Sequence, residues 1–352
     1  IVRTALDSGI GVCAIYEGYR GLIEGGDRIR PLEWSDVGGI IQLGGTVIGS
    51  ARSQEFRARE GRLAAARNMI AHGIDSLVVV GGDGSLTGAD LFRREWPDLV
   101  GDLVARGDVA ADAAVRHPRL TVVGLVGSID NDAAGTDMTI GADTALHRIT
   151  EAIDAIGSTA SSHQRGFIVE VMGRHCGYLA LMGAIATGAD ALFIPECPPG
   201  DRWEDDLVAT LKAGRAAGRR DSIVVVAEGA LDRQGQPITS ERVRAALASW
   251  LGGEVRVTVL GHMQRGGAPS AYDRNLGTVM GYAAIDTLLS GAADAQSLVM
   301  GMRGNRVVRI PLDECVADSR RINEALAARE FDRALELRGT SFNDALRTFN
   351  TL

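Results

Sequence analysis

The sequence lacks the features of a secreted or membrane protein. Its 352 residues include only 4 cysteines, none in CxxC spacing, which is typical of a reduced cytosolic protein. No run of 18 apolar residues is present and no signal peptide is visible, so we expect no transmembrane helix. The formal net charge of −8 argues against a general nucleic-acid surface. We therefore predict a cytoplasmic protein that binds neither nucleic acid nor membrane.

The remaining composition favours a two-domain α/β protein. The length suits two domains of ordinary size, 45% hydrophobic residues suffice for buried cores, and 45 glycines indicate many tight turns. Short Val/Ile-rich runs alternate with helical patterns, which predicts doubly wound domains with mainly parallel sheets flanked by helices. Strands are predicted at residues 11–16, 76–80, 121–126, 167–171, 191–194, 222–227 and 255–260, and helices at 55–72, 142–156, 202–216, 240–250 and 273–289.

Polar, glycine-rich segments follow two of the predicted strands, at the carboxyl ends where parallel sheets bind ligands. Residues 81–85 read GGDGS, and residues 127–132 read GSIDND. By contrast, residues 102–118 are polar, alanine-rich and weakly patterned. We interpret them as a surface insertion.

The GGDGS segment has the composition of a phosphate-binding loop. Glycines allow backbone N–H groups to surround phosphate oxygens, and the N-terminus of the following helix adds positive potential. Asp83 is placed to hold Mg²⁺ directly or through water. The alternative interpretation is an ordinary strand-to-helix turn with Asp83 as a cap. Kinases with other acceptors carry similar loops, so this motif does not fix the substrate.

The GSIDND segment carries two carboxylates, Asp130 and Asp132, two residues apart. This spacing points both to the same side if the segment is extended. Phosphoryl transfer to an alcohol needs a carboxylate to take the hydroxyl proton and charges to neutralise the transferring group. The alternative is a cluster of Asx-turns that bind only the local backbone.

Basic residues lie around two further strands. Arg165 and Arg174 flank the strand at 167–171, and their planar guanidinium groups match phosphate oxygens. Surface arginines at strand ends are the alternative. A second basic set suits a sugar phosphate and is expected around the carboxyl end of the strand at 255–260; it comprises Arg256, His262 and Arg265.

A smaller signal is the carboxylate at the end of the predicted strand at 222–227. Glu228 follows this apolar run directly. A glutamate at the end of a buried strand usually has a specific hydrogen-bonding role. Hydrogen bonds to sugar hydroxyls would be such a role.

Taken together and in this order, the motifs resemble the 6-phosphofructokinase family over essentially the whole chain. Four features resemble the amino-terminal, catalytic half of the eukaryotic type: the insertion before Leu120, the segment with Phe56, and the segments at 195–199 and 337–342. The alternative origin is a single-length bacterial enzyme with eukaryote-like sequence. The matching segments are GGDGSLTGAD, GSIDND, GTDMTIGADTALHRI, SHQRGF, VEVMGRHCGYLAL, VAEGA, ITSE, RVTVLGHMQRGG and PSAYDR.

This resemblance implies an allosteric glycolytic kinase that transfers a phosphoryl group from MgATP to the 1-hydroxyl of fructose 6-phosphate, giving fructose 1,6-bisphosphate and ADP. Asp130 would be the general base, Asp83 the magnesium ligand, and Ser128 and Arg174 would steady the transferring group. The implied catalytic residues are Ser128, Asp130, Asp132 and Arg174; the ATP-binding residues are Arg52, Ser53, Gly82, Asp83, Gly84 and Ser85; and the substrate-binding residues are Ser128, Ile129, Asp130, Arg165, Met172, Gly173, Arg174, Glu228, Arg256, His262, Met263, Gln264 and Arg265.

The resemblance also implies an assembly and a phosphoryl donor. The counterparts of Arg165 and Arg256 in this family typically reach into a neighbouring subunit's site, which implies a homo-oligomer, either a tetramer or a higher assembly of halves. Pyrophosphate-using relatives commonly have Asp in place of Gly84 and Lys in place of Gly127. A carboxylate at the first position would crowd and repel the α-phosphate, so glycine at both favours ATP.

The expected domains are an ATP-binding domain of residues 1–141 and 264–305, and a fructose 6-phosphate-binding domain of 142–263 and 306–352 that includes the carboxyl-terminal helices. The family begins with a strand and a Gly-Gly-Asp-x-x-Gly-Met-Asn loop that contacts ATP. No such loop precedes Ile1, and residues 1–6 have a helical pattern. We therefore expect a strand and a loop of this kind upstream.

The motifs allow three other interpretations. One is a pyrophosphate-dependent phosphofructokinase, and another is a different kinase with a GGDG loop, which would explain only one motif. The third is a non-catalytic regulatory half that binds a sugar phosphate or a nucleotide. Such halves typically lose the catalytic aspartate, whereas Asp130, Asp132 and Arg174 are all present here.

Overall fold

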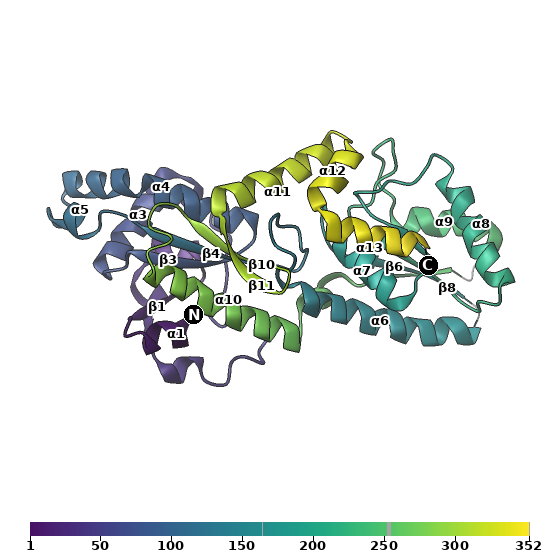
Figure 1. The fold of residues 1–352 in the computed structure, drawn as a ribbon, viewed down its shortest axis with the longest axis horizontal. Helices are drawn as coiled ribbons and strands as arrows, with labels where there is room; N and C mark the ends of the chain where they lie inside the picture. Colours follow the sequence, from purple (N-terminus) through teal and green to yellow (C-terminus); the bar gives the residue numbers. More distant parts are fainter. Residues whose placement is uncertain (164, 252–254, 352) are drawn as a thin grey trace. The chain divides into compact units, whose positions relative to one another are not determined.

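The structure is a computed structural model that describes residues 1–163, 165–251 and 255–351, and it divides into two compact units (Figure 1). Unit 1 comprises Ile1–Gly127 and Gly267–Val316, and unit 2 comprises Ser128–Gly266 and Ala317–Leu352. The predicted assignment of ATP to one domain and fructose 6-phosphate to the other stays a prediction. None of the described helices is long and apolar enough to cross a membrane.

The main sheet of unit 1 has the strand order β11-β10-β4-β3. Strands β3 (Ser76–Gly81), β4 (Thr121–Ser128) and β10 (Leu298–Arg303) run parallel, and β11 (Arg306–Pro311) is antiparallel to β10. The register pairs the last residue of β3 with Val126. The loops that follow β3 and β4 therefore leave the same edge of the sheet.

The long helix α4 (Asp83–Arg106) is held in unit 1 by an aromatic core. Its Phe92 and Trp96 are fully buried and pack edge to face, and the Trp96 indole donates to the His117 carbonyl oxygen at 3.0 Å. The remaining elements of unit 1 are α1 (Val2–Asp7), α2 (Tyr19–Glu24), η1 (Gly26–Arg28), η2 (Trp34–Val37), η3 (Glu55–Arg57), α3 (Arg59–Ala71), α5 (Ala113–Arg116), α10 (Ala271–Leu289) and the start of α11 (Leu312–Ala327).

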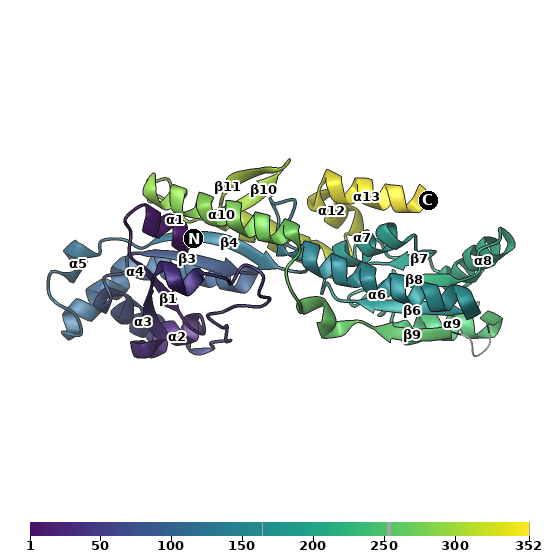
Figure 2. The same ribbon diagram turned by 90° about the horizontal axis from the view of Figure 1, so that it is seen from below.

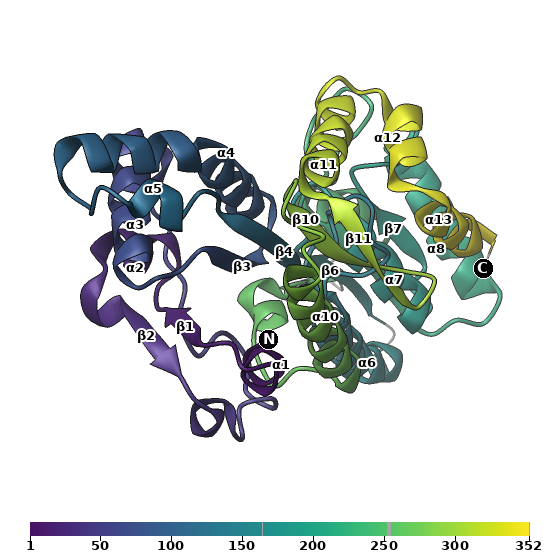
Figure 3. The same cartoon turned by 60° about the vertical axis from the view of Figure 1, so that its left-hand side comes forward.

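Two strands of unit 1 form a separate small sheet. Strand β1 (Val12–Ile15) pairs antiparallel with β2 (Ile29–Leu32), with Val12 opposite Leu32 (Figure 3). Strand β1 matches a predicted strand. Strand β2 was not predicted, because its Arg-Pro centre breaks the apolar pattern.

Unit 2 is a three-layer α/β/α structure around a parallel sheet of order β7-β8-β6-β9 (Figure 2). Alternate residues of β6 and β8 enter two cores on opposite faces. One core contains α6, α7 and α13, and the other contains α8 and α9. The elements of unit 2 are β5 (Ile140–Gly141), α6 (Ala142–His163), β6 (Gly166–Val171), α7 (Tyr178–Thr187), β7 (Ala191–Phe193), α8 (Trp203–Ala216), β8 (Ser222–Ala227), α9 (Ser240–Leu251), β9 (Val255–Val259), η4 (Gly261–Arg265), the end of α11, α12 (Phe331–Arg338) and α13 (Thr340–Thr351).

The structure contains each predicted strand, and it corrects three other expectations. The predicted helix at 55–72 is divided into η3 and α3, and the one at 142–156 extends to His163. The proposed insertion at 102–118 is partly wrong, since residues 102–106 form the last turn of α4, which buries Leu103 and ends at Gly107 with φ 75°. The hairpin of β10 and β11 was missed, because Gly301 and Arg309 interrupt its apolar runs.

Candidate active site

The turn from β3 to α4 in unit 1 holds the predicted phosphate-binding loop. Helix α4 begins at Asp83, and Ser85 N and Leu86 N donate to the Gly82 carbonyl oxygen at 3.0 and 3.1 Å. The N–H groups of Asp83 and Gly84 precede these bonds, at the start of the helix, where no intrahelical acceptor exists. A Cβ atom at Gly82 or Gly84 would meet no atom within 4 Å, so the space beside these two residues is open. The loop can therefore present N–H donors to an anion.

Asp83 is exposed in the first turn of α4 and accepts from the Thr87 hydroxyl at 3.3 Å. Among the described residues, no group of three His, Cys, Asp or Glu side chains could hold a metal by itself. Mg²⁺ is usually bound by one or two carboxylates together with waters and substrate phosphates. A single exposed carboxylate beside a phosphate-binding loop fits that pattern.

A tyrosine that the sequence reasoning missed supports this loop. Tyr19 donates its hydroxyl to the Ser85 carbonyl oxygen at 2.5 Å, and its ring stacks on Phe56 with 3.9 Å between centroids. Burial raises the pKa of Tyr19, so its hydroxyl stays protonated and donates. No spacing in the sequence relates Tyr19 to Ser85, which lies 66 positions away.

Two other predicted nucleotide residues of unit 1, Arg52 and Ser53, lie in the loop before η3. Ser53 accepts from Phe56 N at 3.2 Å, so its hydroxyl closes the local turn, while the Arg52 side chain is exposed. Gly127 lies on β4 beside the loop, where a Cβ atom would approach Val80 Cγ1 to 3.3 Å. A larger residue there would push on the strand that carries GGDGS.

In unit 2, the loop after β4 folds back on itself and is not extended. Asn131 has φ 51°, so the two-residue spacing of Asp130 and Asp132 does not reflect strand geometry, which corrects the sequence argument. The Ser128 hydroxyl donates to Asp132 Oδ1 at 2.9 Å and accepts from Asp130 N at 3.3 Å. Thr139 N donates to Asn131 Oδ1 at 2.8 Å, and the Thr139 hydroxyl donates to the Ser128 carbonyl oxygen at 2.6 Å.

The carboxylate of Asp130 is buried and only partly compensated. Its side chain is 5% exposed, Oδ2 lies 3.5 Å from Arg174 Nε, and Oδ1 has no hydrogen-bond partner. Burial raises its pKa, and the negative charge of Asp132 adds to the rise, while Arg174 and Arg265 oppose it. A buried carboxylate with a raised pKa and a vacant acceptor atom is the usual form of a general base.

The loop that carries Arg174 follows β6 and is fixed by Glu228. The Glu228 carboxylate Oε1 accepts from Gly173 N at 3.3 Å and from Arg174 N at 2.5 Å. Arg174 has φ 52°, a conformation that costs free energy for a residue other than glycine. The predicted substrate residue Glu228 therefore also holds the backbone of Arg174 in place.

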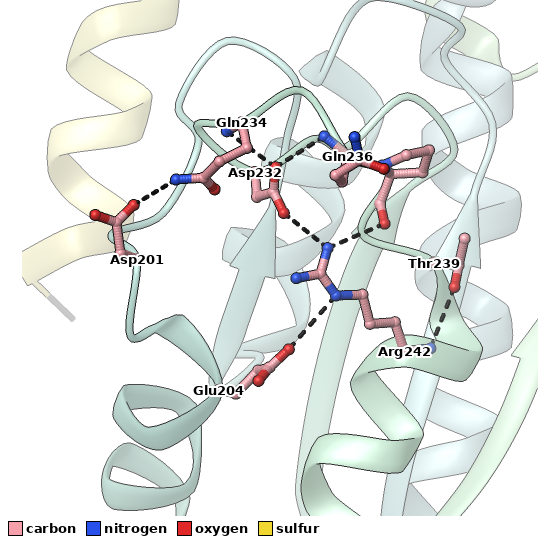
Figure 4. Close-up of polar contacts among 8 residues, drawn as sticks. Asp201, Glu204, Asp232, Gln234, Gln236, Thr239 and Arg242 are labelled. Carbon is pink, nitrogen blue, oxygen red and sulfur yellow. Dashed lines mark hydrogen bonds and ion pairs between the residues drawn. The ribbon is translucent and has the colours of Figure 1, made fainter.

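The segment after Glu228 is anchored by a polar cluster around Arg242 (Figure 4). The buried Asp232 accepts from Gln236 N and from Arg242 Nη1, both at 2.8 Å. Arg242 Nε also lies 3.4 Å from Glu204 Oε1, and its guanidinium covers the Trp203 ring at 5.1 Å. This cluster joins α8 and α9 to the loop that begins with Glu228.

The 3-10 helix η4 has three exposed side chains and one buried glutamine. His262 and Arg265 are exposed, and Arg265 is among the charges that act on Asp130. Met263 is 71% exposed. Gln264 is buried, where its amide accepts from Met172 N at 3.1 Å and donates to Gly261 O at 3.1 Å. In this geometry Gln264 fixes the end of β6.

Arg165 and Arg256 lie at the amino ends of their strands in the unit 2 sheet, whereas Arg174 follows the carboxyl end of β6. Arg165 immediately precedes β6, and Arg256 is the second residue of β9, opposite Phe167 in the register. The sequence expectation that Arg256 lies at the carboxyl end of its strand is therefore wrong. Six residues of β6 span about 20 Å, at about 3.3 Å per residue. These arginines are grouped with each other and not with Asp130.

Comparison with known proteins agrees with this fold and these motifs. The family model for phosphofructokinase matches residues 1–288. ATP-dependent 6-phosphofructokinase, muscle type, of Oryctolagus cuniculus is 54% identical over all 352 residues, which cover 45% of that protein, and the Homo sapiens protein of the same name is 53% identical. The chain belongs to the phosphofructokinase family and matches the amino-terminal half of these larger relatives.

Solved structures support the same conclusion. The phosphofructokinase of Saccharomyces cerevisiae has a TM-score of 0.96 and 50% identity, with 99% of this chain and 47% of that chain covered. The Pichia pastoris phosphofructokinase in the T-state has a TM-score of 0.93 and 50% identity, covering 100% and 37%. A pyrophosphate-dependent phosphofructokinase from Marinobacter aquaeolei, at 22% identity and a TM-score of 0.67, shares the fold. The chain spans about half the length of the curated relatives it matches.

Proposed function

We propose that this chain is the catalytic part of an ATP-dependent 6-phosphofructokinase, which transfers a phosphoryl group from MgATP to the 1-hydroxyl of fructose 6-phosphate. The observation that carries the proposal is the buried Asp130 carboxylate, with its unpartnered Oδ1 and the Arg174 guanidinium 3.5 Å from Oδ2. Membership of the family and the resemblance of the catalytic motifs support the choice of substrates.

In this proposal, Asp130 Oδ1 accepts the proton of the sugar 1-hydroxyl as the oxygen attacks the γ-phosphate. Arg174 and Ser128 stabilise negative charge on the transferring group. Glu228 holds the Arg174 backbone, while Arg265 and His262 bind the sugar phosphate. Mg²⁺ on Asp83 would neutralise the nucleotide phosphates when bound.

We assign ATP as the phosphoryl donor because positions 84 and 127 are both glycine. The open space over Gly84 leaves room for a nucleotide, and a carboxylate there would project into that space. The relatives at 50–54% identity whose names state a donor are ATP-dependent, whereas the pyrophosphate-dependent proteins are 19–22% identical.

We also propose that the working enzyme is a homo-oligomer. Arg165 and Arg256 lie together about 20 Å along the sheet from the Asp130 loops, so they suit a phosphate bound by another subunit.

The described cysteines are all free, which supports a reducing, cytoplasmic setting.

The test is ATP-dependent formation of fructose 1,6-bisphosphate by the full-length protein, measured with unmodified enzyme and with Asp130→Ala. The unmodified enzyme should turn over with ATP, and the variant should bind fructose 6-phosphate without turning it over. An unmodified protein that binds the sugar phosphate but gives no product would instead be a regulatory half.

A further inference from the structure

A buried ion pair lies behind the loop that carries Arg174. The Glu196 side chain is fully buried and the Arg338 side chain is 6% exposed, and Arg338 Nε donates to Glu196 Oε1 at 2.9 Å. The two residues are separated by 142 positions in the sequence. Burying two charges is expensive, so a pair of this kind stabilises the fold little unless its remaining donors and acceptors are also satisfied.

The remaining hydrogen bonds of the pair go to the backbone of this loop. Both carboxylate oxygens of Glu196 accept from Gly177 N at 3.0 Å, at the start of α7, and Arg338 Nη2 donates to the His175 carbonyl oxygen at 2.9 Å. A Cβ atom at position 177 would lie 2.6 Å from Glu196 Oε2, so only glycine allows this approach. The pair therefore fixes residues 175–177 at two points: Glu196 accepts from Gly177 N, and Arg338 donates to the His175 carbonyl oxygen.

These same residues are continuous with the catalytic contacts. Cys176 N donates to the Gly173 carbonyl oxygen at 2.8 Å, and the Cys176 thiol donates to Asn131 O at 3.7 Å. Burial raises the pKa of the Cys176 thiol, so it stays a donor. The loop is thus held by Glu228 at Gly173 and Arg174, and by the ion pair at its other end.

We propose that Glu196 and Arg338 are positioning residues that hold the Arg174 guanidinium against Asp130, and that they act through the backbone of residues 173–177. This inference rests on the proposed function. Without the pair, the strained backbone at Arg174 is held at one end only, and its side chain is free to leave Asp130. A displacement of about 1 Å in a catalytic group can cost about 10²-fold in rate.

The test variant is the double substitution E196Q/R338M in the full-length enzyme. It removes one charge of each sign, so no unpaired charge is left buried. The matched control is Arg333→Met in the same helix, which removes an exposed arginine paired with Glu336. We expect kcat to fall about 10–100-fold in the double variant, with a much smaller change in the KM for fructose 6-phosphate and no change in the control.

The pH profile of kcat separates positioning from a general loss of stability. The charged groups that face Asp130 are Asp132, Arg174, Arg265 and Glu228. Arg174 favours the ionised form of Asp130, so its displacement should move the acidic limb of the profile to higher pH, in the direction given by Arg174→Met. In the Arg174→Met background, the double substitution should cost little further activity, because the group that it positions is already absent.

Arg338→Lys provides a second measurement if the double variant does not fold. Lysine keeps the charge beside Glu196 but loses the planar arrangement that also reaches His175 O, so an intermediate loss of kcat and an intermediate shift of the limb are expected. A variant with the kcat and acidic limb of the Arg333→Met control, but a lower melting temperature, would show that the pair is only structural. An inactive unmodified enzyme would refute the proposed function itself, whereas active enzyme with unaffected pair variants refutes this inference alone.

Discussion

Replacing Asp130 with asparagine should separate the catalytic role of this carboxylate from its effect on stability. The amide has the shape of the carboxylate but cannot take the hydroxyl proton, so we expect kcat to fall by about 10²–10⁴-fold. Each factor of ten corresponds to about 1.4 kcal/mol, so the activation free energy should rise by about 3–5 kcal/mol. The KM for fructose 6-phosphate should change much less, because the base acts in the chemical step.

The same substitution should not destabilise the folded protein at neutral pH. Burial raises the pKa of Asp130 in the folded state, and Asp132 adds to the rise. Between the unfolded and folded pKa values the folded state binds more protons, so the free energy of unfolding decreases as pH rises through that window. At pH 7 the ionised carboxylate therefore lowers stability. Asp130→Asn should melt at the wild-type temperature or above it, and the difference should vanish below about pH 4.

The assay couples product formation to a spectroscopic signal and is accompanied by thermal unfolding of each variant. Asp190→Asn is a matched control, because burial also raises the pKa of Asp190, which precedes β7 at the opposite edge of the unit 2 sheet. It should leave kcat within about twofold. Asp130→Asn that retains more than about a third of the wild-type kcat would remove Asp130 from the role of base. A loss of kcat matched by a fall in melting temperature would point to unfolding.

Three further predictions concern the neighbouring residues. Arg174→Met should move the acidic limb of the kcat profile to higher pH, because the guanidinium lowers the pKa of Asp130, and an unmoved limb would mean that another group titrates. Gly84→Asp should lower ATP-supported kcat/KM by about 10²-fold through repulsion of the phosphates, while comparable turnover of the unmodified enzyme with pyrophosphate would contradict the donor assignment. Mixed oligomers of Arg165→Ala and Asp130→Ala chains should recover part of the lost activity in a refolding assay. Mixed oligomers that form without any recovery would contradict shared sites.

Sequence patterns were sufficient for the buried strands and for the motifs that follow them. The run from Ser222 to Ala227 is apolar after its first residue and is buried on both faces, so its pattern predicted both its type and its bounds. The antiparallel strands β10 and β11 were not predicted, because Gly301 and Arg309 interrupt a pattern that is completed only by pairing across the Gly304 turn. Local periodicity contains no information about such pairing.

The sequence was sufficient to predict the residue types of the site, but not the contacts that hold these residues in place. Asp130, Arg174 and Glu228 were named from motifs, but the sequence did not show that Glu228 binds the backbone of Arg174. Likewise Tyr19 and Arg338 reach their partners across 66 and 163 positions, and no spacing rule relates residues so far apart. Arg256 was grouped wrongly with His262 and Arg265, although the predicted strand at 255–260 already placed it near the amino end, as the structure does.

Backbone strain provides an independent reason to place the chemistry in these loops. In the described residues, five that are not glycine have a positive φ. Asn305 lies in the β10–β11 hairpin turn and Arg329 follows α11, where left-handed residues are common. The other three lie in the loops of the candidate site: Glu17 is two residues before the tyrosine that supports the phosphate-binding loop, while Asn131 and Arg174 flank the buried carboxylate. Strain of this kind persists only where surrounding contacts over-determine it, and it concentrates at functional sites. The Asn131 side chain is fixed by Thr139, and the Arg174 backbone by Glu228, so the fold maintains strained conformations in both loops that meet at Asp130.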